Sequence, residues 1–427
     1  MTTMPFPATA LVARTARLPV ADAEALLRLL PAAPPSDLVS WVRRGDGLVG
    51  WGRALATTTS GPDRFADAAA WWRSVAGGAV VRDDVRLPGT GPIVFASMTY
   101  SAASATASVL VVPEVVVGRR GDQAWVTTVT TDGSLPYAVP LAPAPDPPAP
   151  GVVAFADGAR SAAEWELAVA DAVDRITDNR LDKVVLARSL LARTEVDIDA
   201  RWLLQRLQDR YDTTWVFAVD GLVGATPEML VRLDRGLATS RVLAGTIRRT
   251  GDDTHDLALA ASLARSSKDL EEHEYAVRSV ADALGRHCTS MYVPEAPFVL
   301  HLANVMHLAT DVAGVVDDGT NSLELACALH PSAAVCGTPT PVADALITEL
   351  EGMDRGRYAG PVGWMDADGD GEWGIALRCG ALTPDDPRQI TLYAGCGIVA
   401  GSDPEDEVAE SDAKFLPMRD ALTAARD

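Results

Sequence analysis

The segment TWVFAVDGLVGATPEMLVRLDRGLATSRVLAGTIRR, residues 214–249, decides the fold class of this 427-residue chain. It places three strand-like runs one after another, separated by short turns near residues 220 and 235 rather than by helices. Successive strands joined by short turns pair antiparallel, whereas a doubly wound sheet requires a helix between neighbouring strands. The segment therefore predicts an α+β fold rather than a doubly wound one.

The flanking sequence continues this alternation of long strand meanders with a few helices. Upstream, a helix at 162–178 leads into the strand-like LDKVVLARSLLAR at 181–193 and a helix at 199–209. The downstream elements are a helix at 269–286, strand-like residues 298–314, a helix at 321–328, hairpin strands within 358–365 and 372–382, a strand within 389–402 and a terminal helix from 404. Pro417 should end or kink that last helix.

Residues 1–150 have a weaker pattern. Short β-like runs occur at 79–81, 93–97, 108–117 and 124–130, and the region ends in LAPAPDPPAP at 141–150. A proline-rich stretch of this kind is an extended connector. It marks either a domain boundary or a crossing between two parts of one core.

Composition excludes several classes of partner. The net charge is −21 and the pI is about 4.6, which argues against nucleic acid or an anionic membrane as a partner. Five scattered cysteines without a CxxC pair predict reduced thiols. We find neither a signal-peptide h-region nor an apolar run of the ~20 residues that span a membrane. We expect a cytoplasmic protein, and a monomer because no apolar helix face stands out.

Three sequence motifs resemble binding sites but lack features that such sites require. DADGDG at 366–371 begins like an EF-hand loop, but loop position 12 is Leu377 and both flanks are strand-like, so an acidic hairpin turn is the better interpretation. The glycines at 395, 397 and 401 do not have dinucleotide-binding spacing. His301 and His307 have no carboxylate nearby in sequence, which favours core or substrate-contact roles over a metal pair.

Lysine is rare, occurring only at 183, 268 and 414 among 37 basic residues. Strand alternation puts Lys183 on one face with Val185 and Ala187. An ammonium among apolar neighbours is desolvated, which lowers its pKa and makes a neutral base accessible. The alternative is an edge-strand lysine that discourages aggregation. Spacing alone does not separate the two.

Carboxylates supply the other candidates. Glu228 follows a proline at the start of an apolar strand, where burial would raise its pKa and suit a general acid, although spacing alone favours a surface Glu at a strand end. Asp269 with Glu272, and Glu407 with Glu410, are i, i+3 pairs at helix starts. Each pair is either a capping and dipole feature or, if the pairs converge, a Mg²⁺ site.

Lys414 lies four residues after Glu410 and seven after Glu407, so it shares their helix face. A cation beside two carboxylates forms at least a salt bridge. Beside a metal-bound substrate it would clamp an anion.

From about 160 to 420 the chain resembles the chorismate-utilising enzymes, isochorismate synthases most closely. The resemblance is carried by eight ordered blocks: LDKVVLAR, GATPEMLVRL, LAGTIRR, SSKDLEEHEYAV, LHPSAAVCGTP, RGRYAGPVGW, IALRCG and YAGCGIVAGSDPEDEVAESDAK. It implies a single α+β domain over residues 1–427, a sandwich of two stacked antiparallel sheets flanked by helices. Residues 1–150 would be its divergent N-terminal part and 160–425 its chorismate-binding catalytic region.

The resemblance also implies residue roles. Lys183 would activate water for attack at C2 of chorismate, and Glu228 would protonate the departing C4 hydroxyl. Mg²⁺ would be held by Glu272 and Glu410, with Asp269 and Glu407 supporting its waters. The positions that match the substrate site are Gly245, Thr246, His307, Tyr358, Arg378, Gly395 and Lys414. The positive charges of Arg378 and Lys414 would offset the substrate's two carboxylates. Lys268 is expected to form a structural ion pair.

Family members differ in their nucleophile. Ammonia-using enzymes carry an amide where Lys183 stands, and aminodeoxychorismate synthases carry a lysine where Ala244 stands, so this chain points to water. The implied activity is conversion of chorismate to isochorismate for menaquinone or siderophore biosynthesis. The block HPSAAVCG at 330–337 is similar to the isochorismate synthase form HPTPAVGG but departs from it at Ser332, Ala333 and Cys336. Salicylate synthase is the close alternative, and a catalytically silent binding protein is a remote one.

Overall fold

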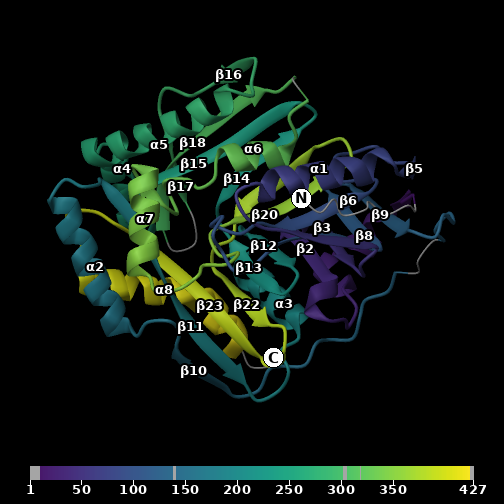
Figure 1. Ribbon diagram of the computed structural model, residues 1–427, viewed down its shortest axis with the longest axis horizontal. Coiled ribbons are helices and arrows are strands. Elements are labelled where there is room, and N and C mark those ends of the chain that lie inside the picture. Colours follow the sequence, from purple (N-terminus) through teal and green to yellow (C-terminus); the bar gives the residue numbers. More distant parts are fainter. Residues whose placement is uncertain (1–9, 138–140, 302–304, 318, 424–427) are drawn as a thin grey trace. The chain divides into compact units, whose positions relative to one another are not determined.

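The computed structural model describes residues 10–137, 141–301, 305–317 and 319–423 (Figure 1). Within them the strands form two mostly antiparallel sheets with helices on their flanks, which confirms the predicted α+β class. The chain divides into two compact units. Unit 1 comprises residues up to 227, 331–367 and 375–427, and unit 2 comprises residues 228–330 and 368–374.

Unit 1 is built on a long sheet with the order β10-β11-β23-β22-β13-β12-β2-β3-β8-β9-β1-β5, in which β19 also pairs with β11. Its strands are β1 (Val12–Leu18), β2 (Leu38–Arg43), β3 (Asp46–Trp51), β5 (Val80–Asp83), β8 (Val115–Arg120), β9 (Gln123–Thr130), β10 (Val153–Asp157), β11 (Lys183–Thr194), β12 (Trp215–Val219), β13 (Leu222–Thr226), β19 (Gly337–Thr338), β22 (Cys379–Thr383) and β23 (Asp386–Ile398). The same unit contains β4 (Leu55–Thr59), β6 (Ile93–Ser97), β7 (Ser108–Val112) and β20 (Pro361–Asp366), and the helices α1 (Arg64–Gly77), α2 (Ala162–Thr177), α3 (Ala200–Arg210), α7 (Thr340–Leu350) and α8 (Pro404–Thr423).

Unit 2 has the strand order β16-β18-β15-β14-β21, with β17 on β18. The strands are β14 (Met229–Asp234), β15 (Leu237–Arg248), β16 (Ser290–Tyr292), β17 (Phe298–His301), β18 (Val305–Val315) and β21 (Gly371–Ile375), and the helices are α4 (Asp253–Leu263), α5 (Ser267–Gly285) and α6 (Ser322–Ala328). Helix α5 packs on β15 and β18 (Figure 1). His273 fixes that packing, because its Nε2 lies 2.7 Å from Thr310 Oγ1.

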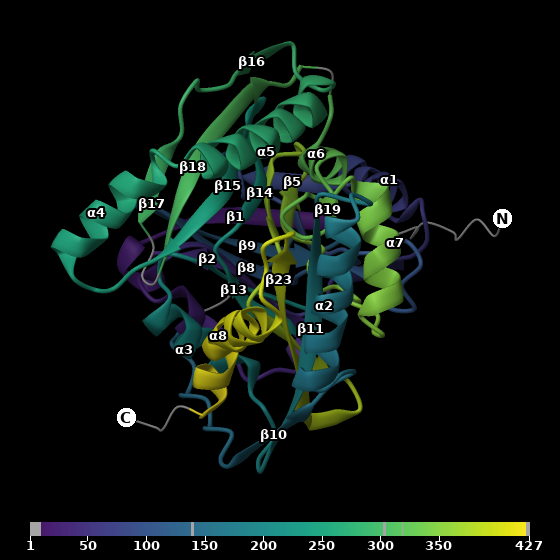
Figure 2. The same cartoon turned by 90° about the vertical axis from the view of Figure 1, so that its left-hand side faces the viewer.

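The strand β11 lies near one end of the long sheet of unit 1, between β10 and β23. It pairs antiparallel with β23 from Val184↔Ile398 to Arg193↔Gln389. Helices α2 and α7 run alongside β11, and α8 packs on β23 (Figure 2). The core there is apolar, with Leu190, Leu392 and Phe415 among its buried members. This packing fixes the N-terminal end of β11, where Lys183 lies.

Most of the elements predicted from the sequence are confirmed, including α2, β11, α3, α5, α6 and β23. Helices α1, α4 and α7 and strands β1 to β4 are additional to the prediction. Helix α8 does not end after Lys414, since it continues through Pro417 to Thr423. Phe415, Met418 and Leu422 are buried along that last stretch, and their burial offsets the ~3 kcal/mol that an interior proline costs.

The connector, the acidic turn and the cysteines were also predicted from the sequence. Residues 141–150 contain neither helix nor strand, as expected for a connector, and Arg201 Nη1 donates to Pro145 O at 3.1 Å. In the acidic segment, residues 367–370 form the turn between β20 and β21, and both carboxylate oxygens of Asp370 accept from the Arg235 N–H at 2.9 and 3.0 Å. All five cysteines are free thiols. Among the described residues no helix is long and apolar enough to cross a membrane.

Candidate active site

Lys183 is the first residue of β11 and is half-buried. Its backbone is held on two sides: β19 places Thr338 opposite it, and the next residue, Val184, pairs with Ile398 of β23. The side chain lies over Gly397, because a Cβ added there would be 2.9 Å from Lys183 Cε and 3.4 Å from Nζ. The prediction that Lys183 shares a strand face with Val185 and Ala187 agrees with this position.

A buried ion pair forms hydrogen bonds with the edge of β11, between the stretch that pairs with β19 and the stretch that pairs with β10. Arg355 Nη2 donates to Val185 O at 2.7 Å, and Glu351 Oε1 accepts from the Ala187 N–H at 2.7 Å. The two side chains pair with each other and are only 3% and 1% exposed. Trp165 Nε1 donates to Ala187 O at 3.1 Å. Beside Lys183, side chains thus supply the backbone of β11 with hydrogen bonds that a neighbouring strand would otherwise make.

Two glycines leave one face of β23 bare. Gly395 pairs with Ala187 and Gly397 with Val185, so both lie on the face that Lys183 occupies. A Cβ at Gly395 would be 3.1 Å from Tyr358 Oη. Tyr358 is buried and stacks on Tyr393 with ring centroids 5.1 Å apart, and burial raises the pKa of its phenol. The bare face therefore gathers three predicted site residues, Lys183, Tyr358 and Gly395.

Helix α8 brings charge to the same strand. Lys414 Nζ donates to Gly395 O at 2.9 Å and pairs with Glu410 Oε1 at 2.6 Å. The predicted helix face of Glu407, Glu410 and Lys414 is therefore directed at β23. Glu410 is half exposed, whereas Lys414 is mostly covered.

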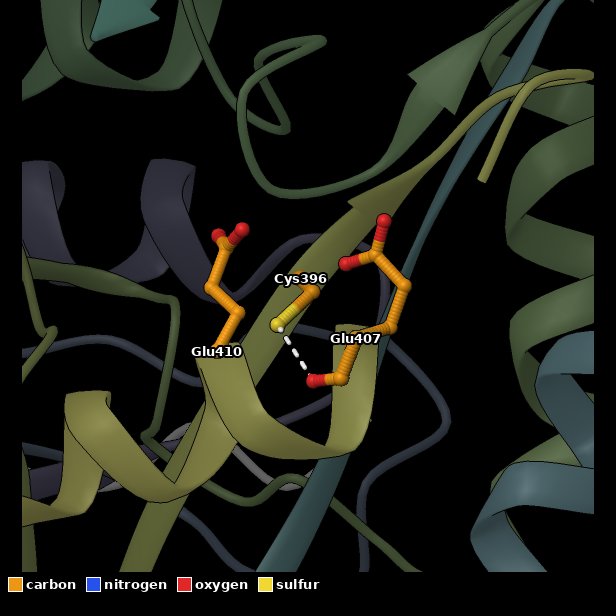
Figure 3. Close-up of side chains that lie close together, drawn as sticks. All are labelled: Cys396, Glu407 and Glu410. Carbon is orange, nitrogen blue, oxygen red and sulfur yellow. Dashed lines mark hydrogen bonds between the residues drawn. The ribbon is translucent and has the colours of Figure 1, made fainter. Parts of the chain in front are cut away.

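Cys396 completes a potential metal-binding group with the two glutamates of α8. Its Sγ and one carboxylate oxygen each of Glu407 and Glu410 lie within 4.8 Å of one another (Figure 3). Glu407 Oε1 accepts from Ser402 Oγ at 2.7 Å, while Oε2 is buried without a hydrogen-bond partner among the described residues. Burial raises the pKa of the Glu407 carboxyl, and Ser402 opposes this. A cation or its water would satisfy that oxygen.

Arg378 follows β21 in a strained backbone conformation. Its φ is +50°, in the left-handed region that non-glycine residues rarely adopt. Its carbonyl oxygen accepts from the Ala225 N–H at 3.2 Å, which fixes this turn. Burial lowers the pKa of the Arg378 guanidinium, and the negative charges of nearby groups, Glu410 included, oppose that shift. Strain at a partly buried cation is the kind of outlier that marks functional sites.

In unit 2 the predicted residues gather at a bulge in β15. The register with β18 shifts between Ala244 and Thr246, leaving Gly245 with a φ of +73°. A Cβ at Gly245 would be 3.2 Å from Asp269 Cβ, so glycine is required both for the bulge and for the approach of α5. His307 is the β18 residue opposite Thr246 and is half-buried.

Asp269 occupies the first turn of α5, where Ser266 Oγ accepts from its N–H at 3.3 Å. The side chains of Thr246, Lys268 and Glu272 lie outside the described part of the structure. Glu228 is half-buried between β13 and β14. Each unit thus holds one of the two predicted carboxylate pairs.

Sequence reasoning missed three contributors to the unit 1 site: Cys396, Gly397 and the Glu351–Arg355 pair. Cys396 and Gly397 lie inside a quoted motif, and strand alternation could have shown that Gly397 shares the face of Gly395. No local signal marks Glu351 and Arg355 beyond their i, i+4 spacing, which is common on surface helices.

Comparison with known proteins gives the family. Residues 143–423 match the profile of the family described as chorismate binding enzyme. The chain belongs to the chorismate-binding enzymes. It is 40% identical over 271 residues to the isochorismate synthase DhbC of Bacillus subtilis, covering 61% of this chain and 67% of that protein. It is also 40% identical over 281 residues to the salicylate biosynthesis isochorismate synthase of Pseudomonas aeruginosa, a match that covers 64% of this chain and 58% of that protein.

The fold of this chorismate-binding enzyme matches solved structures over nearly its whole length. The menaquinone-specific isochorismate synthase MenF of Escherichia coli superposes with a TM-score of 0.79 at 24% identity, covering 99% of this chain and 97% of that one. At this identity the likeness concerns the fold alone. It extends to the described residues before position 150, where the sequence pattern was weakest.

Proposed function

We propose that this chorismate-binding enzyme is an isochorismate synthase, which adds water at C2 of chorismate and releases the C4 hydroxyl. The observation that carries the proposal is Lys183, a half-buried lysine on a strand face kept bare by glycine. Lysine can act as a neutral base when desolvated, whereas the arginine used elsewhere in this chain cannot. The relatives of about 40% identity that are named isochorismate synthases support the same activity.

The proposed reaction conserves atoms as an isomerisation. Lys183 takes a proton from water while the water oxygen forms a bond to C2 and the ring double bonds shift. The C4–O bond breaks, and Glu228 gives its proton to that oxygen, so that one water enters and one leaves. Ala244, which offers no amine, leaves water as the nucleophile.

The substrate carries two carboxylates, and a chain of net charge −21 requires local cations to bind it. We assign Arg378 and Lys414 to this task. Lys414 is held toward Gly395 by its bond to that carbonyl. The other proposed substrate contacts are Gly245, Thr246, His307 and Tyr358.

Mg²⁺ is the proposed cofactor, with Glu272 and Glu410 as ligands and Asp269 and Glu407 bonding its waters. The donors fit, because Mg²⁺ prefers carboxylate oxygens and retains several waters. Glu407 Oε2, which is buried and has no hydrogen-bond partner in the described part of the chain, is an acceptor suited to such a water. Bound Mg²⁺ would neutralise charge on the substrate carboxylate.

We further propose that the whole chain forms one α+β catalytic domain that acts as a cytoplasmic monomer, without nucleic acid or membrane partners. Its product would enter menaquinone or siderophore biosynthesis, and the structurally similar MenF of Escherichia coli is named as menaquinone-specific.

Incubation with chorismate and Mg²⁺, followed by chromatography, tests the proposal. Accumulating isochorismate supports it. Salicylate with pyruvate would instead identify a salicylate synthase, and unaltered chorismate a silent binding protein. Replacing Lys183 by Ala should abolish turnover while the circular dichroism spectrum is kept; unchanged turnover would remove Lys183 from the mechanism.

A further inference from the structure

Gly397 has no conformational reason to be glycine. It lies inside β23, paired with Val185, and its φ is outside the left-handed region. Glycine within a strand weakens it and often marks a place where another group approaches closely. At Gly397 the approaching group is a side chain, since the nearest atoms to an added Cβ are Lys183 Cε and Nζ.

The backbone of Lys183 pairs with Thr338, and the residues on either side of it are hydrogen-bonded as well. Asp182 N–H donates to Thr338 O at 2.8 Å, and Val185 N–H donates to Cys336 O at 2.8 Å. A side chain at position 397 therefore displaces the lysine side chain rather than its strand. Gly337 provides a contrast, since a Cβ there would be 2.2 Å from Lys183 O, a backbone atom that cannot move aside.

We propose that Gly397 is a positioning residue for Lys183: its bare Cα is the surface on which the lysine side chain rests, and this sets where the ammonium group stands. The inference rests on the proposed role of Lys183 as the base, but the position of the side chain can be tested without that role. A methyl group at 397 would stand 2.9 Å from Lys183 Cε, which is too close for a normal contact, so it moves Nζ away from its working position.

The test is Gly397→Ala, with Gly401→Ala as the matched control because no atom lies within 4 Å of a Cβ at Gly401. A misplacement of about 1 Å can cost roughly hundredfold in rate. We expect kcat of Gly397→Ala to fall about ten- to hundredfold with KM nearly unchanged. Gly401→Ala should behave as the unsubstituted enzyme.

The second measurement does not use activity. The chain has lysines only at 183, 268 and 414, so amine labelling with an acylating reagent can be followed at each site by peptide mass spectrometry. In Gly397→Ala the labelling rate at Lys183 should change by about threefold or more, because its amine moves into a different environment, while the rate at Lys414 stays constant. General loss of structure would change all the rates together.

The outcomes test the positioning role of Gly397 separately from the general-base role of Lys183. Wild-type labelling at Lys183 in Gly397→Ala overturns the positioning role, whatever the activity. Altered labelling with unchanged kcat shows that the displacement has no catalytic consequence and also overturns it. An active Lys183→Ala enzyme would instead refute the general-base assignment, and the labelling would still report whether Gly397 places the side chain.

Discussion

The buried pair beside β11 yields the sharpest stability prediction, for Glu351→Gln. Gln keeps the shape of the side chain and an oxygen that can accept from the Ala187 N–H, so the strand edge stays bonded. What is lost is the counter-charge of Arg355, which is buried and also donates to Val185 O and Val335 O at 2.7 Å. Leaving one partner of a buried ion pair uncompensated costs about 3–5 kcal/mol.

Glu349→Gln is the matched control, because Glu349 lies two residues earlier on α7 and pairs with Arg175. That pair is solvent-exposed, with the Glu349 side chain 57% exposed, and pairs of this kind contribute about 0–1 kcal/mol. Urea unfolding of both variants, followed by circular dichroism at one pH, measures the difference. Equal unfolding midpoints for the two variants would refute the reasoning that burial makes the Glu351–Arg355 pair important.

Three further predictions concern single sites. Lys183→Arg should lower kcat by about 10²–10⁴, since arginine cannot act as a base, whereas Lys414→Arg keeps the charge and should retain most activity; similar losses in both variants would contradict the assignments. Arg378→Gly and Arg378→Ala should each lose about ten- to hundredfold in kcat/KM. The glycine variant should be more stable than the alanine variant by roughly 1 kcal/mol, because glycine adopts the φ of +50° without steric cost. Thermal melts that rank alanine above glycine would argue against strain. The bonds from Thr250 and Arg249 lower the pKa of the Asp256 carboxyl to about 2, so its stabilising effect is present above pH ~4 and lost as the pH falls toward 2. The difference in melting temperature between the unsubstituted protein and Asp256→Asn should therefore shrink from pH 5 to pH 3, and a constant difference would exclude this titration.

Local pattern predicted the fold well where periodicity was strong. The strand β11 is rich in valine, leucine and alanine and is almost wholly buried. The helix α2 is amphipathic and begins with a capping box at Ser161 and Glu164. Helix α4 was not predicted because its apolar residues are not confined to one face, although Asp252 caps it by accepting from the His255 N–H at 2.8 Å. Helix α7 begins with a proline in its first turn, which is a start signal that the sequence analysis did not use.

The site residues also fall into those that local spacing predicts and those that it does not. Residues that belong to a local motif, such as Glu410 and Lys414 four apart on α8, could be placed on a common face from spacing alone. The contact of Lys183 with Gly397, more than two hundred residues away, depends on the register of β11 against β23. Register is set by the packing of both strands and cannot be read from either one.

The sequence by itself determined the α+β class, the family resemblance and the residue types available for acid, base and metal chemistry, because these depend on periodicity and ordered motifs. Only the tertiary structure decided that Glu351 and Arg355 complete the edge of β11, that Cys396 lies beside Glu407 and Glu410, and that Lys183 rests on Gly397. The physical reason is that backbone hydrogen bonds and close packing join segments distant in sequence. Whether a lysine is a surface charge or a held base is fixed by those neighbours.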